Sequence, residues 1–453
     1  IHKIMNENDL MSKMKISKAV ATMAIPSVIS SLVTVVYNMA DTFFVGQTGD
    51  PLQVAAVSLT NPIFILFMAF ANMFGMGGSA AASIAMGEKN EKRMKNVSAF
   101  ITYASLITGI FFAVILLLGA KPILEIFGAN KQTYDLAYGY LFHISYGAPF
   151  IIWSAAASFV VRSEGASKEA MIGSMIGTVV NIILDPIMIS GLHMGAAGAA
   201  IATTIGNVLA SLYYAWYFIK KSKCFSIHPG YFKYKDKILT TVCSSGFPTA
   251  IFSVLMSVST IVLNQILVVY GNAPVAAIGI VFKANMFITF LQMGLANGVQ
   301  PLLGYNYGAG NIKRFRAVES YTKKCCLVVG ILATVLYFVF RTQIIKLFIS
   351  DPEVINYGVT MLIAYMISGP IIGLLFMNMN CMQSVGRALP ATILSVLRQG
   401  VLLIPLLYLL NAVAGIHGVI YGQALTDYIA VILSTIIWKR YQNSITKEKD
   451  SAK

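Results

Sequence analysis

Charged residues are scarce in this chain of 453 residues, where Asp, Glu, Lys and Arg together make up 11%. A globular protein carries roughly 25% charged residues, most of them at its surface. A soluble chain of this length would therefore lack the charge needed to cover its surface. Disorder is excluded as well, because hydrophobic residues make up 57% and disordered segments need low hydrophobicity. The composition predicts an all-α, polytopic membrane protein.

Cysteine is also scarce, with five residues and no CxxC spacing. An odd number of cysteines without paired spacing argues against a disulfide scaffold or a zinc site. The net charge of +15 does not indicate a nucleic-acid-binding surface, because the basic residues lie in short segments between long apolar runs. We expect no nucleic-acid partner and no cofactor.

Sequence motifs for enzymes and for ATP-driven pumps are missing. Only two histidines fall inside predicted spans, His143 and, at the very start of the last span, His417, and neither HExxH nor GxSxG occurs. The phosphate-binding GxxxxGK[ST] loop is missing too. An intramembrane enzyme and a pump driven by ATP on this chain are therefore disfavoured, and a secondary transporter is expected.

Twelve apolar runs are long enough to cross a bilayer as helices, since a span needs about 20 apolar residues. They lie near residues 17–44, 53–78, 97–118, 136–160, 170–190, 195–219, 238–269, 275–302, 318–340, 356–380, 390–411 and 416–438. An even number of spans places both termini on the same side of the membrane.

The basic residues indicate which side that is. Of the 33 Lys and Arg residues, 27 lie on the side of the termini, four lie in the opposite loops, and two lie inside spans. Because basic residues favour the cytoplasmic side, both termini are predicted in the cytoplasm of a cell-membrane protein. The basic loop 220–237 is the expected linker between an N-terminal lobe, residues 1–219, and a C-terminal lobe, residues 238–453.

The two halves repeat each other at an offset of about 221 residues. GEKNEKRMKNV at 87–97 aligns with GAGNIKRFRAV at 308–318, and the register holds through a polar loop. Six spans separate equivalent positions, so the repeats run parallel and are related by an axis along the membrane normal. This pattern predicts two six-helix lobes facing each other across a central cleft.

Three carboxylic acids lie inside predicted spans, at Asp41, Asp185 and Asp427. A charge at the bilayer centre costs about 2.5–3.5 kcal/mol, so such residues usually face a cavity and serve transport or pairing. Asn181 precedes Asp185 by four residues and shares its helix face, and Thr203 lies in the next span. These oxygen ligands suit a proton or Na⁺ rather than a transition metal. The sequence does not indicate whether the coupling ion is H⁺ or Na⁺.

Other polar residues in spans carry weaker signals. Lys283 and Arg398, with Asp427, form a possible secondary polar site, and Arg398 and Asp427 lie in neighbouring spans. Snorkelling or structural pairing explains these charges equally well. Pro26 is expected to kink the first span, either as a moving part or as a static bend.

The segment IPSVISSLVTVVYNMADTFFVGQTGDPLQVAAVSLTNPI at 25–63 resembles the opening of the multidrug and toxic compound extrusion (MATE) family. NIILDP at 181–186 and the glycine-rich segment 191–207 resemble the same family, and the bacterial MepA-like branch is the most similar. The resemblance implies export of amphipathic, often cationic compounds in exchange for H⁺ or Na⁺. It also implies a hinge at Pro26 and an ion-coupling site, able to hold Na⁺, formed by the residues Asp41, Asn181, Asp185 and Thr203.

One position departs from some MepA-like relatives, which have a glutamate where this chain has Asn297. That departure puts a coupling site in the C-terminal lobe in doubt. The alternative function is a flippase for lipid-linked saccharides, or another metabolite exporter with the same two lobes. A flippase needs a ring of central basic residues, whereas only Lys283 and Arg398 lie inside spans. The expected partners are a small amphipathic substrate and the lipid bilayer, and the expected state is a monomer.

Overall fold

A computed structural model describes residues 10–127, 129–233 and 237–451, and these form helices without strands. The N-terminal half contains the α-helices α2 (Ile16–Gly46), α3 (Pro51–Gly87), α4 (Glu91–Leu118), α5 (Ala120–Ile126), α6 (Tyr134–Ser163), α7 (Ser167–Asp185) and α8 (Gly195–Trp216), with the π-helices η1 (Pro186–Gly191) and η2 (Tyr217–Lys221). The C-terminal half contains α9 (Ile238–Leu267), α10 (Asn272–Gly308), α11 (Ile312–Val339), α12 (Arg341–Lys346), α13 (Pro352–Ile367), α14 (Gly369–Ser384), α15 (Ala388–Val396), the π-helix η5 (Leu397–Leu402) and α16 (Leu403–Ser451). Short 3₁₀ turns occur at Pro229–Tyr231 (η3) and Val268–Tyr270 (η4).

The helices account for twelve membrane spans in the described part of the chain. Ten segments are long and apolar enough to cross a bilayer by themselves, and the bent pair α13 and α14 makes an eleventh. The longest of the ten, Ala388–Ser444, reverses at Gly415, whose backbone φ of 58° and ψ of −143° are not helical. A Cβ on Gly418 would meet the Leu410 backbone, as expected where two antiparallel helices cross. The reversal supplies the twelfth span.

The repeat seen in the sequence is also present in the backbone. Asn90 and Asn311, 221 residues apart, each cap a helix by accepting a hydrogen bond of 3.0 Å from the backbone N–H three residues later. The preceding residues Lys89 and Gly310 both have positive φ, at 58° and 70°. The short helices α5 and α12 also begin 221 residues apart. Each half is therefore built on the same plan.

The halves differ at one span. α6 is continuous, but its counterpart breaks at Ser368 into α13 and α14, which are bent by 47°. A single span at 356–380 was predicted, so that prediction is wrong in its continuity. The break leaves the last carbonyls of α13 without helical partners. Ser368 donates to the Tyr365 carbonyl at 3.1 Å, and Tyr428 of α16 donates to the Ile367 carbonyl at 3.1 Å. In the first turn of α14, Gln292 of α10 donates to the Gly369 carbonyl at 2.6 Å. A side chain from a neighbouring helix thus replaces a helical hydrogen bond within the membrane.

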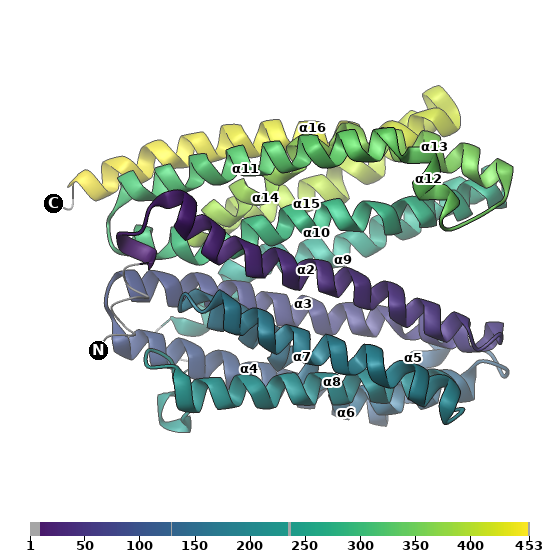
Figure 1. Cartoon of the computed structure of the whole chain (residues 1–453), viewed down its shortest axis with the longest axis horizontal. Helices are drawn as coiled ribbons and strands as arrows, with labels where there is room; N and C mark the ends of the chain where they lie inside the picture. The colour runs from purple at the N-terminus through teal and green to yellow at the C-terminus, as the bar shows by residue number, and fades with distance from the viewer. Residues whose placement is uncertain (1–9, 128, 234–236, 452–453) are drawn as a thin grey trace.

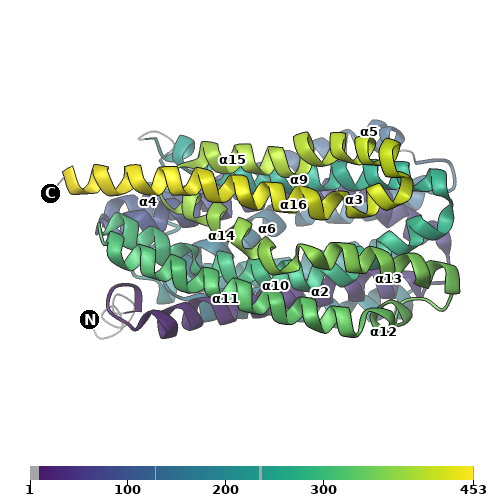
Figure 2. The same ribbon diagram turned by 90° about the horizontal axis from the view of Figure 1, so that it is seen from above.

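The two lobes lie one above the other in Figure 1, with α3 to α8 in one and α9 to α16 in the other. Helix α2 runs between them and packs against α7 of its own lobe and α10 of the other lobe. Both chain ends lie at the same end of the bundle, which we call the terminal end; the opposite end is the far end (Figures 1 and 2).

Close contacts between the lobes gather in the terminal half of the bundle. Gly77 of α3 and Gly246 of α9 lie where a Cβ on either would collide with backbone of the other helix. Glycine allows two backbones to approach this closely in membrane proteins. Arg314 of α11 donates to the carbonyls of Met14 at 2.6 Å and Met11 at 3.0 Å, which binds the start of the N-terminal lobe to the C-terminal lobe. The terminal end of the interface is closed.

The predicted linker 220–237 packs back onto the N-terminal lobe. Ser98 of α4 donates to the Ser226 carbonyl at 3.0 Å, and Tyr103 donates to the Ile227 carbonyl at 2.8 Å. The Phe232 ring stacks on Phe100. Residues 234–236 of the linker lie outside the described residues, and the assignment of residue 219 as the lobe boundary stays a prediction.

Candidate ion-coupling site

Three helices of the N-terminal lobe bring the predicted polar residues together. Asn181 and Asp185 lie one turn apart on α7, and Thr203 faces them from α8. All three side chains are buried, and Asp185 has no exposed surface. The Asn181 amide lies between its partners, 3.1 Å from Thr203 Oγ1 and 3.0 Å from Asp185 Oδ2. With its nitrogen toward the carboxylate, the amide donates to Asp185 and accepts from Thr203.

The backbone changes at Asp185, which is the last residue of α7. Pro186 follows and begins the π-helix η1, which extends to Gly191. Proline has no N–H to donate, so the carbonyl one turn earlier loses its helical partner. Single π turns inside helices occur frequently at functional sites. The sequence signal of an aspartate followed by proline therefore marks a real irregularity beside the buried carboxylate.

Asp41 approaches this group from α2. Its carboxyl lies close enough to Asp185 to interact electrostatically, and both acids interact with the phenols of Tyr37 and Tyr140. The Tyr37 hydroxyl lies 3.3 Å from Thr203 Oγ1, so it links α2 to α8. The structure thus brings together the four residues predicted to form the site.

Two tyrosines of this cluster were missed by reasoning from the sequence. Tyr37 precedes Asp41 by one helical turn, which is a spacing that could have identified it. Tyr140 lies on α6 and is buried, and nothing in its sequence context indicates the contact. Thr204, next to Thr203, does not join the cluster and donates instead to the His143 carbonyl at 3.2 Å.

The cluster offers oxygen atoms to a small cation. Carboxylate, amide and hydroxyl oxygens are the ligands that hard cations accept, and a carboxylate also takes up a proton. Asp185 Oδ1 is buried and has no hydrogen-bond partner among the described residues. A buried carboxylate oxygen without a partner is costly unless a proton or a cation satisfies it. The donor set therefore fits H⁺ or Na⁺.

Pro26 lies inside α2, which continues as one helix from Ile16 to Gly46. Ser30 donates to the Pro26 carbonyl at 3.0 Å, one turn further along. The neighbouring residues Ala24 and Ser27 pack against Gly298 of α10. Pro26 therefore lies within the stretch of α2 that packs on the other lobe, and its role as a hinge stays a prediction.

The possible secondary polar site separates into two parts. Arg398 Nε donates to Asp427 Oδ1 at 2.8 Å, and Gln423 donates to the same oxygen at 2.9 Å. The Arg398 guanidinium lies over the rings of Phe252 and Phe376 inside the C-terminal lobe. This is a buried, paired charge. Lys283 is instead exposed on α10 and is not part of the pair.

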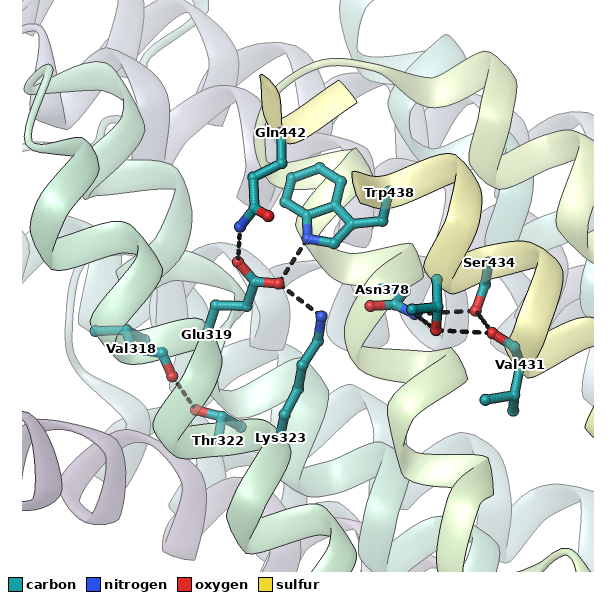
Figure 3. Close-up of polar contacts among 10 residues, drawn as sticks. Val318, Glu319, Thr322, Lys323, Asn378, Val431, Ser434, Trp438 and Gln442 are labelled. Carbon is teal, nitrogen blue, oxygen red and sulfur yellow. Dashed lines mark hydrogen bonds and ion pairs between the residues drawn. The ribbon is translucent and has the colours of Figure 1, made fainter. Parts of the chain in front are cut away.

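A second buried acid in the C-terminal lobe was not singled out from the sequence. Glu319 of α11 accepts hydrogen bonds from Lys323 and Trp438 at 2.6 Å and from Gln442 at 2.8 Å (Figure 3). It joins α11 to the last turns of α16. Its position at the edge of a predicted span, among basic residues, made it resemble a loop acid.

The comparisons with known proteins agree with this architecture. The MatE family model matches residues 26–187 and again 248–409, one match in each lobe. The multidrug export protein MepA of Staphylococcus saprophyticus is 32% identical over 437 residues, which is 96% of each chain. MepA of Staphylococcus aureus strain MSSA476 is 31% identical over 425 residues, or 94% of each chain.

A solved structure supports the same fold. The outward-facing conformation of a multidrug resistance MATE family transporter of the MOP superfamily superposes with a TM-score of 0.92. It is 24% identical and the alignment covers 97% of this chain and 98% of that one. Two family matches, extended similarity to curated exporters and a shared two-lobe fold lead to one conclusion. The chain is a multi-pass membrane transporter that belongs to the MatE family, and it is similar to the MepA multidrug export proteins.

Proposed function

We propose that this protein is a secondary antiporter that exports amphipathic, often cationic compounds in exchange for H⁺ or Na⁺. The observation that carries the proposal is the cluster around Asp185, where two acids, an amide and a hydroxyl meet in the membrane. The chemistry of this set suits a small cation and offers no nucleophile–base pair. The names of the curated relatives as multidrug export proteins support the choice of cargo.

The proposed cycle has two states that differ in which end of the lobe interface is closed. In the structure the terminal end is closed, and the excess of basic residues supports a cytoplasmic position for that end. A cation from outside binds at Asp41 and Asp185 in this state. The opposite state closes the far end, releases the cation to the cytoplasm and admits the cargo. Exchange requires that the ion binds the two states with different affinities.

Transport in proteoliposomes tests the proposal. Export of a fluorescent cationic dye is measured under a pH gradient and, separately, under a Na⁺ gradient. We expect one of the two gradients to drive export by the wild-type protein. Asp41→Asn and Asp185→Asn are each expected to abolish it, because an amide cannot take up a proton and carries no charge for Na⁺.

The matched control is Asp135→Asn, which makes the same change at an exposed acid in the first turn of α6. It should export dye at the wild-type rate. Gradient-driven export at the wild-type rate by well-inserted Asp41→Asn or Asp185→Asn protein would reject the coupling role.

A further inference from the structure

Lys283 is an exposed cation deep in the membrane. It lies eleven residues after Asn272, where α10 begins at the far end. At 1.5 Å per residue that places it about 16 Å below the far end, near the centre of the bilayer. An intramembrane lysine facing lipid is costly, so such residues usually face a water-filled cavity or a partner.

The face of α10 that carries Lys283 is the face that meets the other lobe. Gly294 and Gly308 follow Lys283 by 11 and 25 residues, which puts all three within about 20° of one direction around the helix. A Cβ on Gly294 would lie 2.9 Å from the Val28 Cα, and one on Gly308 would lie 3.1 Å from the Ile84 Cα. Gly279, one turn from Lys283 toward the far end, has nothing within 4 Å. This face is closed in its terminal half and open around Lys283.

The packing of α10 on α2 fixes which residues of α2 lie level with Lys283. The two helices run antiparallel, and Gly294 contacts Val28 while Gly298 contacts Ala24. Because the helices are antiparallel, each step toward the far end lowers the residue number by one on α10 and raises it by one on α2. Both contacts therefore place Lys283 level with residue 39 of α2. Asp41 lies two residues further, or about 3 Å of helix rise.

We propose that closing the far end of the interface brings the Lys283 ammonium to Asp41, where it takes the place of the transported cation. Asp41 interacts electrostatically with Asp185, Tyr37 and Tyr140, and none of these groups carries a positive charge. Lys283 is a positioning residue that acts through Asp41. The inference rests on the proposed two-state antiport.

The pair gives the two states different affinities for the ion. With the far end open, Lys283 is exposed and Asp41 is available to H⁺ or Na⁺. With the far end closed, a positive charge at about 7 Å from the ion weakens its binding roughly 50-fold at an effective dielectric constant near 20. The ion then leaves toward the cytoplasm. A charge fixed to α10 thus converts the movement of the lobes into release of the ion.

Disulfide formation tests the approach of the helices. The pair Lys283→Cys and Asn38→Cys is made in a background without the five native cysteines. Asn38 lies two turns after Ser31, on the side of α2 that packs on Gly294. We expect the two cysteines to crosslink during exchange. The control pair Lys283→Cys with Ser31→Cys is about 12 Å out of register and should not crosslink.

Dye export is also measured on the double-cysteine variant after its disulfide is reduced. A failure of the antiport proposal can then be told apart from a failure of the inference about Lys283. If neither a pH gradient nor a Na⁺ gradient drives export by the wild-type protein, the antiport proposal is wrong. A variant that exports dye but never crosslinks at Lys283 and Asn38 overturns the inference about Lys283.

Substitutions at Lys283 test its effect on the ion. Lys283→Gln should make transport more sensitive to the ion on the cytoplasmic side, with half-inhibition at a concentration up to about 50-fold lower. Lys283→Arg should restore the wild-type concentration. Because Asp41→Asn protein is expected not to export dye, binding of the ion is measured directly in that background, and adding Lys283→Gln should leave it unchanged. Unchanged half-inhibition in Lys283→Gln protein, or the same change in ion binding with and without Asp41, overturns the inference.

Discussion

Arg314→Ala is expected to open the terminal end of the lobe interface. The Arg314 guanidinium donates to the carbonyls of Met14 and Met11, at 2.6 and 3.0 Å, and more weakly to that of Leu10 at 3.4 Å. These bonds join α11 to the segment that leads into α2. They require a closed terminal end, because the two partners belong to different lobes.

The expected size of the effect follows from these bonds. A hydrogen bond from a charged donor contributes about 1.5–3 kcal/mol, and partial exposure of Arg314 reduces the value. Two strong bonds therefore stabilise the closed terminal end by about 3 kcal/mol. At 1.4 kcal/mol per tenfold change, their loss shifts the population toward the opposite state roughly 100-fold.

Labelling of Ser83→Cys measures this shift. Ser83 of α3 is fully buried and lies against Gly304 of the other lobe, so a thiol there reacts with a polar maleimide only when the terminal end opens. Labelling should be much faster in Arg314→Ala protein than in the parent. Lys313→Ala removes the same charge from an exposed neighbour and should leave the rate unchanged. Equal labelling rates in Arg314→Ala and parent protein would refute the reasoning.

Two further predictions concern buried acids of the C-terminal lobe. Asp427→Asn leaves the Arg398 guanidinium without its counter-charge and should lower stability by about 3 kcal/mol, seen as a lower melting temperature in detergent. Its effect on ion-coupled export should be milder than that of Asp41→Asn, and a complete loss of export by folded protein would contradict this. Glu319→Gln leaves Lys323 uncompensated and should cost roughly 2 kcal/mol, with faster proteolysis at the end of α16. An unchanged melting temperature and cleavage rate would show that the Glu319 cluster does not hold that helix.

The polar residues of the N-terminal site were predictable because the membrane makes them conspicuous. Asp41 and Asp185 stand in long apolar runs, and the spacing of Asn181 and Asp185 fixes their common helix face. The repeat was visible for a related reason, since the caps at Asn90 and Asn311 keep their register in polar loops that are easy to align.

Contacts between distant helices were not predictable in the same way. Tyr140 joins the site through packing of α6, and no local pattern encodes that approach. Beside the break at Ser368, the Gly369 carbonyl accepts a hydrogen bond from Gln292, which lies 77 residues earlier in the chain. Glu319 is buried by α16 rather than by its own helix. The sequence therefore predicted the elements and the chemistry of the site, but not the partners that long-range packing supplies.

The break between α13 and α14 has a consequence for how this lobe can vary. Gln292 reaches the Gly369 carbonyl through a space beside Gly330 and Gly373, where a Cβ would collide with its amide. Replacing Gln292 removes the side-chain donor to that carbonyl, and a side chain in place of Gly330 or Gly373 leaves the amide without room. We therefore expect descendants of this chain to keep the glutamine and both glycines, or to lose all of them together with the bend.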